Sequence, residues 1–418
     1  MSAPRPDGLV LAPFRALRFS AEADLRTVTS PPYDVIDAAG VEALERASDH
    51  NVVRLILPRD ETDEGDRYLR AASTLSAWRS AGVLVPDPAP ALYVYEQASS
   101  THAQRGLLGA LALTPPEDGI VLPHENTMSG TVSDRLALYT AVEADLEPIF
   151  LLYGGGGTAS EVVADPPGAP LLDVELADGL RHRLWAVTDP ETLAAIAADL
   201  HGRTSVIADG HHRYATYLQR QAAADGRGPW DFGLTFLVDS SAFGPEVHPI
   251  HRVVPDVEAF ELARRADGAM TVHDLDGDDL ADALEALAAA GPHAFLLVSG
   301  DGGTLRLLTG PDPTHLAAAM PAERSPAWRA LDVSVLHAYL VADVWGLVDD
   351  VETVRYAHDA EEAVALAAAT NGTAVLLNPT PVDAVTSVAA GGERMPRKST
   401  LFTPKPRTGL VIRDHRDS

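Results

Sequence analysis

The stretch from 206 to 214 constrains the backbone of this chain most, because it changes from strand to helix within two residues. Its first three residues are apolar and predict a buried strand. Asp209-Gly210 follows as a tight turn, where glycine permits a backbone conformation that side chains oppose. His211 then begins a predicted helix that runs to about residue 224.

The side chains of this turn have the chemistry of an anion site. A helix N-terminus offers free N–H groups and a partial positive charge. His211 and His212 add hydrogen-bond donors, Arg213 can bind a phosphate with two parallel bonds, and Gly210 allows close approach to the backbone. Asp209 can hold a metal ion or orient a histidine. We therefore predict a phosphate site at 209–213; the alternative is a histidine pair that caps a helix without a ligand.

The two lysines are a second unusual feature. The chain has 32 Lys and Arg residues, and all but Lys398 and Lys405 are arginine. Arginine already serves the surface, whereas lysine supplies a compact ammonium on a flexible stem, which suits a phosphate in a tight site. We predict that at least one lysine is functional; the alternative is chance, because two residues are few.

Composition excludes several classes of protein. With 418 residues the chain is too long for one ordinary core, so two or three domains are expected. A net charge of −28 argues against non-specific binding to nucleic acid or to an anionic membrane. The absence of cysteine rules out disulfides, thiolate nucleophiles and zinc–thiolate sites. The sequence has neither a signal-like start nor an apolar run of about 18 residues, so we expect a cytoplasmic protein.

Strand-like and helix-like segments alternate without a strict βαβ order, which predicts an α+β or mixed α/β fold. We place a first region at 1–250, including the phosphate site, and a second at 251–418, whose closing lysine segment returns to that site. Within the first region, 52–57 predicts a buried strand, and its single Arg54 needs a partner because unpaired buried charge is costly. A helix is predicted from 133 to 144.

A polar, glycine-bearing loop precedes that helix and holds a candidate base. Glu125 stands beside His124 and Thr127, and a carboxylate in such a loop can accept the proton of a hydroxyl nucleophile. The alternative is helix capping, with Ser133 as the N-cap and Asp134 in the first turn. Capping explains Ser133 but neither His124 nor Glu125.

Other polar groups are open to two interpretations. His251-Arg252 either contacts an anion or forms a strand-end pair with a carboxylate, Asp34 either caps a helix or replaces Glu125 as the base, and His337 is predicted to be a core histidine. The zinc-hydrolase spacing, the dinucleotide glycine fingerprint and the hydrolase nucleophile turn are absent from the sequence. Donor-rich loops and an isolated carboxylate in an acidic chain favour phosphoryl transfer, in which electrostatic clamping does most of the catalysis.

The motifs together resemble a bacterial and archaeal family known as domain of unknown function 1015. The Asp-Gly-His-His-Arg block is also similar to that of the ParB/sulfiredoxin-like superfamily, which includes kinases of free L-serine. The motifs that carry the resemblance are Pro-Pro-Tyr-Asp-Val-Ile (31–36), His-Glu-x-Thr (124–127) with Asp134-Arg135, Ala-Asp-Gly-His-His-Arg-Tyr (208–214), His-Arg-Val-Val (251–254) and Met-Pro-x-Lys-Ser-Thr-x-Phe-x-Pro-Lys (395–405).

The resemblance implies a ParB/sulfiredoxin-like phosphate-binding core with an additional α/β domain. It also implies a Mg²⁺-dependent kinase that converts free L-serine to O-phospho-L-serine with pyrophosphate or a nucleotide as donor. Catalytic roles fall to Glu125 as base, to Asp209, which is also the metal ligand, and to His211. The residues expected to bind phosphate or substrate are His124, Thr127, Arg135, Gly210, His212, Arg213, His251, Arg252, Lys398, Ser399, Thr400 and Lys405.

One position departs from the family pattern. A lysine usually follows the His-Glu pair, and this chain has Asn126 there. The choice of donor, and activity itself, are therefore open at this point. A non-catalytic sensor of nucleotides or phosphometabolites and a phosphoserine phosphatase are the alternatives; the charge and the lack of a basic helix-turn-helix argue against DNA binding. The oligomeric state is open as well.

Overall fold

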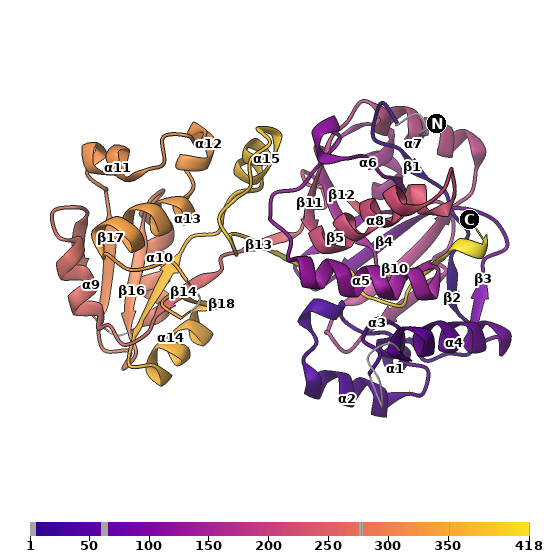
Figure 1. The fold of residues 1–418 in the computed structure, drawn as a ribbon, viewed down its shortest axis with the longest axis horizontal. Helices are drawn as coiled ribbons and strands as arrows, with labels where there is room; N and C mark the ends of the chain where they lie inside the picture. The colour runs from indigo at the N-terminus through magenta and orange to yellow at the C-terminus, as the bar shows by residue number, and fades with distance from the viewer. Residues whose placement is uncertain (1–5, 60–65, 276, 278, 351, 418) are drawn as a thin grey trace. The chain divides into compact units, whose positions relative to one another are not determined.

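The computed structural model describes residues 6–59, 66–275, 277, 279–350 and 352–417. It divides the chain into two compact units, one of Met1–Pro245 with Pro404–Ser418 and one of Glu246–Thr403 (Figure 1). The sequence analysis places a single boundary at 250. The structure has the first break after 245, and it assigns the residues from 404 onward to the first unit instead of the second.

A mixed sheet forms the centre of the first unit. Its strands are β1 (Leu11–Ala12), β4 (Leu92–Ala98), β5 (Ala103–Ala112), β6 (Val121–Leu122), β8 (Ile149–Tyr153), β9 (Leu172–Glu175), β10 (Arg181–Val187), β11 (Ser205–Asp209) and β12 (Phe232–Asp239). They follow the order β6-β11-β8-β12-β5-β4-β10-β9, and β1 pairs with β5. The pairs β6/β11 and β8/β12 are parallel, and the other pairs are antiparallel.

Helices pack around this sheet. They are α1 (Leu25–Val28), α2 (Ala38–Ala47), α3 (Val53–Ile56), α4 (Asp66–Ser80), α5 (Ser129–Val142), α6 (Gly157–Ala164), α7 (Pro190–His201) and α8 (His211–Ala223), with short 3₁₀ turns η1 (Tyr33–Val35), η2 (Pro116–Asp118), η3 (Pro229–Asp231) and η5 (His415–Asp417). Helix α5 packs against both α4 and α8, and α6 packs against α7. The α5–α8 contact includes stacked Tyr139 and Tyr217 rings, whose centroids are 5.4 Å apart.

The predicted strand at 52–57 is a turn of helix, α3. Val52, Val53, Leu55 and Ile56 are all fully buried, so no periodic exposure distinguishes a strand from a helix in so short an apolar run. The Asn51 side chain starts the helix by accepting a hydrogen bond from Val53 N at 2.9 Å. Arg54 does have partners: it donates to the Glu45 carbonyl at 2.9 Å and lies 3.7 Å from the Glu45 carboxylate.

The closing segment 404–417 belongs to the first unit and pairs with residues near the start of the chain. Thr408 forms a two-way backbone bridge with Ser30, at 2.9 and 3.2 Å, and Ile412 forms another with Leu17, at 2.9 Å both ways. Short strands pair on the same side, β2 (Leu17–Phe19) with β3 (Leu84–Pro86) and β7 (Ala144–Asp145) with β21 (Arg413–Asp414). Figure 1 shows the yellow end of the chain beside β2 and β3.

The second unit has a sheet of its own. Its strands are β14 (His251–Val254), β15 (Thr271–Asp274), β16 (Phe295–Ser299), β17 (Leu305–Thr309), β18 (Arg355–Ala357) and β19 (Thr373–Leu377), and a separate pair joins β13 (Glu246–His248) to β20 (Leu401–Thr403). The sheet order is β15-β17-β16-β19-β14-β18, with antiparallel neighbours throughout. The helices are α9 (Ala259–Ala266), α10 (Leu280–Ala289), α11 (Pro313–Ala319), α12 (Pro326–Arg329), α13 (Asp332–Ser334), the π-helix η4 (Val335–Val344), α14 (Ala360–Ala369) and α15 (Val382–Ala390).

These two sheets and their helices make the protein a mixed α/β protein, as the sequence predicts. Helices in the described part of the chain are all too short or too polar to cross a membrane.

Asp145 anchors the closing segment, and its replacement by alanine tests that anchor. Its carboxylate is fully buried and accepts hydrogen bonds from Arg413 at 2.7 Å and from Leu234 N at 3.2 Å, with His415 at 3.0 Å. Asp145→Ala leaves Arg413 buried without this partner, and we expect a loss of about 3–5 kcal/mol in the free energy of unfolding. Chemical denaturation measures this loss.

The matched control is Asp173→Ala, which breaks a 2.6 Å pair with Arg181, a side chain 60% exposed at the surface. Solvent screens such pairs, so we expect little change. Equal losses in the two variants would show that Asp145 does not anchor the segment.

Candidate functional site

The strand-to-helix turn at the end of β11 has the predicted geometry. Asp209 is the last residue of β11, and Gly210 precedes α8 with a φ of 96°, which a residue with a side chain adopts only under strain. A Cβ on Gly210 would also lie 3.1 Å from Arg213 Nε. Glycine here therefore lets the chain turn and lets the Arg213 guanidinium lie against the turn.

Two cations converge on Asp209. Arg213, one helical turn further on, donates from Nη2 to Asp209 Oδ2 at 2.5 Å and from Nη1 to the Pro148 carbonyl at 2.6 Å. Lys405 Nζ lies 2.7 Å from Asp209 Oδ1 and also donates to Asp34. Asp209 and Lys405, almost 200 positions apart in the sequence, thus belong to one ion cluster. The phosphate contact predicted for Lys405 stays a prediction.

The charges in this cluster hold one another ionised. Burial by itself raises the pKa of Asp209, but Lys405 and then Arg213 outweigh it and lower that pKa from 3.8 to about 2. Burial also acts to lower the pKa of Lys405, but Asp209 and Asp34 raise it above its usual 10.5. Both groups therefore stay charged at neutral pH.

A buried carboxylate that the sequence analysis did not select lies behind this cluster. Glu147 is fully buried, and its Oε1 accepts hydrogen bonds from Tyr33 N at 2.9 Å and from Thr408 Oγ1 at 3.2 Å. Burial raises the pKa of Glu147, and the charges of Arg213 and Arg135 oppose that rise. The sequence offers only a weak signal for this residue, a carboxylate next to a proline just before an apolar strand.

The histidines meet on the other side of the turn. His211 Nε2 accepts a hydrogen bond from His124 N at 3.2 Å, and the two rings meet edge to face with centroids 4.6 Å apart. The nearest oxygen of Glu125 is 4.0 Å from His211 Nδ1. The structure thus brings the predicted His124-Glu125 loop to the predicted His-His turn.

His212 determines where the neighbouring helix begins. Its Nε2 accepts a hydrogen bond from Met128 N at 3.0 Å, and α5 starts at the next residue, Ser129. The sequence analysis starts this helix at 133, with Ser133 as a possible cap, whereas Ser133 lies inside the helix. The start of α5 thus coincides with a tertiary hydrogen bond, which the local sequence pattern does not reveal. Thr127, in the loop before it, is exposed.

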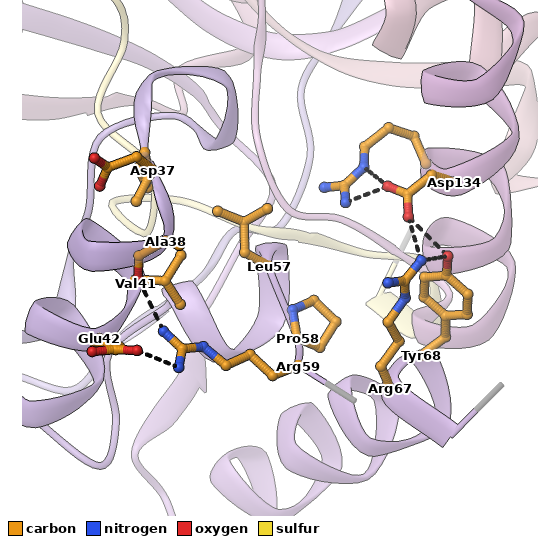
Figure 2. A pocket seen from close by; sticks show the side chains of 12 residues that line it. Asp37, Ala38, Val41, Glu42, Leu57, Pro58, Arg59, Arg67, Tyr68 and Asp134 are labelled. Atoms are coloured by element: carbon orange, nitrogen blue, oxygen red, sulfur yellow. Dashed lines mark hydrogen bonds and ion pairs between the residues drawn. The ribbon is translucent and has the colours of Figure 1, made fainter. Parts of the chain in front are cut away.

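A pocket of about 390 Å³ is lined by residues of α2, α4 and α5, with Asp134 and Arg135 among them. Figure 2 shows its wall, in which the Asp134 carboxylate accepts hydrogen bonds from Arg67 at 2.9 Å, from Tyr68 at 2.8 Å and from Arg135 at 2.6 and 2.8 Å. Arg135 is buried, and its guanidinium lies 4.6 Å from the centre of the Tyr33 ring. The same ring lies 5.9 Å from the Arg213 guanidinium, so Tyr33 separates the pocket from the ion cluster.

The other predicted site residues lie in the second unit. His251 and Arg252 are buried in β14; Arg252 donates to His337 at 3.1 Å, to the Arg397 carbonyl at 3.2 Å and to the Ile250 carbonyl. Burial lowers the pKa of His251 to about 4, so this imidazole is neutral at pH 7. These groups are engaged within their own unit, and their phosphate contacts stay predictions.

The rest of the lysine motif, residues 395–403, also lies in the second unit. Lys398 is exposed and has a φ of 55°, while Ser399 is buried and donates to the Pro396 carbonyl at 2.6 Å. Thr400 is half-buried. The boundary between the units thus runs between the two lysines, and Lys405 is the one that joins the Asp209 cluster.

Asp209 does not fit the predicted role of a metal ligand in this arrangement. One of its oxygens faces Lys405 and the other faces Arg213. In the residues that the structure covers, no three or more histidines and carboxylates group in a way that could hold a metal ion. A magnesium ion would have to come with a ligand that supplies its own oxygens.

Comparison with known proteins places the chain in a family. The family model for "Protein of unknown function (DUF1015)" matches residues 11–334, and the chain belongs to this family. No curated protein matches it.

Three solved structures are similar at a low level. A free serine kinase variant in complex with ADP shows 15% identity, a TM-score of 0.35, and coverage of 70% of this chain and 88% of that one. A conserved hypothetical protein from Pyrococcus furiosus shows 15% identity and a TM-score of 0.33, with coverage of 69% of this chain and 90% of that one. A C-terminally truncated SbnI from Staphylococcus aureus shows 9% identity and a TM-score of 0.36, with coverage of 73% of this chain and 86% of that one.

The shifted pKa of Asp209 makes a pH-dependent prediction. Because this pKa falls from 3.8 to about 2 on folding, the pairs stabilise the protein fully above pH 4 and lose their contribution as the pH falls toward 2. Lys405→Met should therefore lower the free energy of unfolding most above pH 4, and the gap to the wild type should narrow between pH 4 and 2. Urea denaturation across this range measures the gap.

Lys398→Met is the control, because Lys398 is exposed and lies in the other unit. It should show no such narrowing. A gap for Lys405→Met that stays constant down to pH 2 would mean that Lys405 does not stabilise the ionised Asp209.

Proposed function

We propose that this protein is a phosphotransferase that phosphorylates a small hydroxyl amino acid, most specifically free L-serine, to give its O-phospho form. One observation carries the proposal: Lys405, Arg213 and the first residues of α8 converge at the Asp209-Gly210 turn in a chain with a net charge of −28. Positive groups are scarce in this chain, and a helix N-terminus beside an ammonium and a guanidinium is suited to phosphate.

The proposed roles follow from the contacts. Lys405 exchanges one of its carboxylate partners for a phosphate of the donor, while Asp209 keeps the ammonium and the Arg213 guanidinium in place. His211 and His212, at the start of α8, donate to the same phosphate. Phosphoryl transfer needs this electrostatic support more than covalent participation by the protein.

The acceptor hydroxyl needs a base, and two carboxylates are candidates. Glu125 lies 4.0 Å from His211, and Asp34 pairs with Lys405. We propose Glu125, because Lys405 occupies Asp34 whereas the Glu125 loop borders the histidine side of the turn. Asp134 is committed to Arg67, Tyr68 and Arg135.

Finer parts of the proposal rest on family likeness. These are pyrophosphate or a nucleotide as donor, a ParB/sulfiredoxin-like core, and a requirement for Mg²⁺, which on this proposal arrives with the oxygens of the donor. The predicted cytoplasmic location and the predicted lack of nucleic-acid partners rest instead on the composition and net charge of the sequence.

Direct detection of product tests the reaction. Purified protein is mixed with L-serine, MgCl₂ and either pyrophosphate, ADP or ATP, and phosphoserine is measured by mass spectrometry. Lys405→Met should reduce kcat/KM by about 10²–10³-fold, the scale found for loss of one group that stabilises transferred charge. No phosphoserine with any donor, and no reverse reaction, would refute the kinase.

The other outcomes identify the two alternatives. Donor binding without turnover, with affinity unchanged in Glu125→Gln, would indicate the sensor. Release of phosphate from phosphoserine without formation of a phosphorylated donor would indicate the phosphatase.

Paired substitutions identify the base. Glu125→Gln should lower kcat by about 10²–10⁴-fold while leaving KM for the donor nearly unchanged, because only proton transfer is lost. Asp34→Asn should instead change mainly KM for the donor, because it frees Lys405 from one competitor. The reverse pattern would assign the base to Asp34.

A further inference from the structure

Asp34 and Lys405 reach the cluster on two chain segments that have no covalent connection near the site. Asp34 follows the sequence Ser30 to Tyr33, and Lys405 precedes Thr408 by three residues. The Ser30–Thr408 backbone bridge, at 2.9 and 3.2 Å, lines the two segments up. Lys405 donates to Asp34 across these two segments, so a shift of either segment would change this contact.

Glu147 lies across both segments. Its Oε1 takes one hydrogen bond from the backbone of the Asp34 segment, at Tyr33 N, and one from the side chain of the Lys405 segment, at Thr408 Oγ1. Oε2 has no hydrogen-bond partner among the described residues, although the side chain is fully buried. Burying a carboxylate costs free energy, so a carboxylate at this buried position must make interactions that offset the cost.

We propose that Glu147 is a positioning residue that fastens the Asp34 segment to the Lys405 segment and thereby holds the Lys405 ammonium against Asp209. This inference rests on the proposed function for its kinetic consequences only. Its structural part concerns where Lys405 stands, and that part can be tested whether or not the protein turns over substrate.

The opposite side of the Lys405 segment has its own supports, which define what Glu147 adds. The Gln97 and Gln104 side chains donate to the carbonyls of Lys405 and Pro404, each at 2.9 Å. These bonds fix the backbone on one side of Lys405. Arg407 also links the two segments, because its side chain donates to Thr29 Oγ1 at 3.1 Å and to the Thr29 carbonyl at 3.3 Å. Glu147 acts on Thr408, three residues beyond Lys405, and accepts a hydrogen bond from each segment through one side chain.

The two lysines provide a direct assay for the position of Lys405. An amine-acylating ester reacts with the neutral amine, and mass spectrometry follows each lysine separately. Lys398 is exposed and serves as an internal standard, whereas Lys405 is half-buried and paired with two carboxylates. In the wild type we expect Lys405 to react at least about 10-fold more slowly than Lys398, because its two carboxylate partners hold the ammonium in its protonated form.

Substitutions that remove the hydrogen bonds of Glu147 should make the Lys405 amine more reactive. Thr408→Val removes one donor to Glu147 with little change in shape, and Glu147→Ala removes both bonds. We expect acylation of Lys405, relative to Lys398, to rise by about threefold in the first and about tenfold in the second. Glu147→Gln keeps an acceptor oxygen at Oε1 and should stay near the wild type.

The control is Ser160→Ala, which breaks a 2.6 Å bond between Ser160 and Asp239, another buried hydroxyl–carboxylate pair of the same unit. It should leave Lys405 acylation unchanged. If Glu147→Ala fails to fold, Thr408→Val decides the question. Wild-type acylation of Lys405 in a folded Thr408→Val or Glu147→Ala protein would overturn the inference, as would an equal rise in Ser160→Ala.

Kinetics supply the second readout where the protein is active. Glu147→Ala should raise KM for the phosphoryl donor about tenfold, and in a Lys405→Met background the same change should add less than about threefold, because the two residues act as a unit. Additive effects would show that Glu147 does not act through Lys405. If no donor supports turnover, the acylation result still decides on Glu147, and only the proposed function fails.

Discussion

The site of the first unit depends on one shared ammonium. Lys405 stands between Asp209 at the end of β11 and Asp34 in η1, and it brings together segments from the start, the middle and the end of the chain. Without it, two carboxylates would face each other with only Arg213 to balance them. Asp209 stays ionised because Lys405 and Arg213 both lie beside its carboxylate.

The cost of such a cluster explains the structure around it. Charged groups are expensive to bury, and removing one partner of a buried pair leaves the other uncompensated. The chain meets this cost with backbone carbonyls as well as with carboxylates: Arg213 donates to Pro148, and Arg135 donates to Ile56 at 2.7 Å. The buried Asp145–Arg413 pair also holds the closing segment that carries Lys405.

Much of the site was predictable because local rules applied there. The Asp209-Gly210 turn needs glycine and ends an apolar strand, and a helix start offers donors whatever surrounds it. The rarity of lysine drew attention to Lys398 and Lys405 alike, and the structure brings only Lys405 to Asp209 among the described contacts. Glu147 escaped detection because its sequence neighbours mark it only weakly. Its role depends on Tyr33 and Thr408, which lie far away in the sequence.

Other predictions failed where tertiary contacts override local pattern. The buried run at 52–57 lacks the periodic exposure that separates strand from helix, and the Asn51 side chain decides the outcome. Helix α5 begins four residues before Ser133 because His212 holds Met128 N. In both places the deciding partner is a side chain whose position depends on the folded backbone.

The sequence by itself determined the mixed α/β class, the turn chemistry at 209–213 and the special status of lysine, because propensity, glycine geometry and composition are properties of the chain alone. Only the tertiary structure decided that Lys405 joins Asp209 while Lys398 belongs to the other unit, and that Glu147 lies beneath both charged segments. Contacts between residues far apart in the sequence depend on which backbone segments come together in the fold. The free energy that favours one arrangement of segments comes from packing throughout the core.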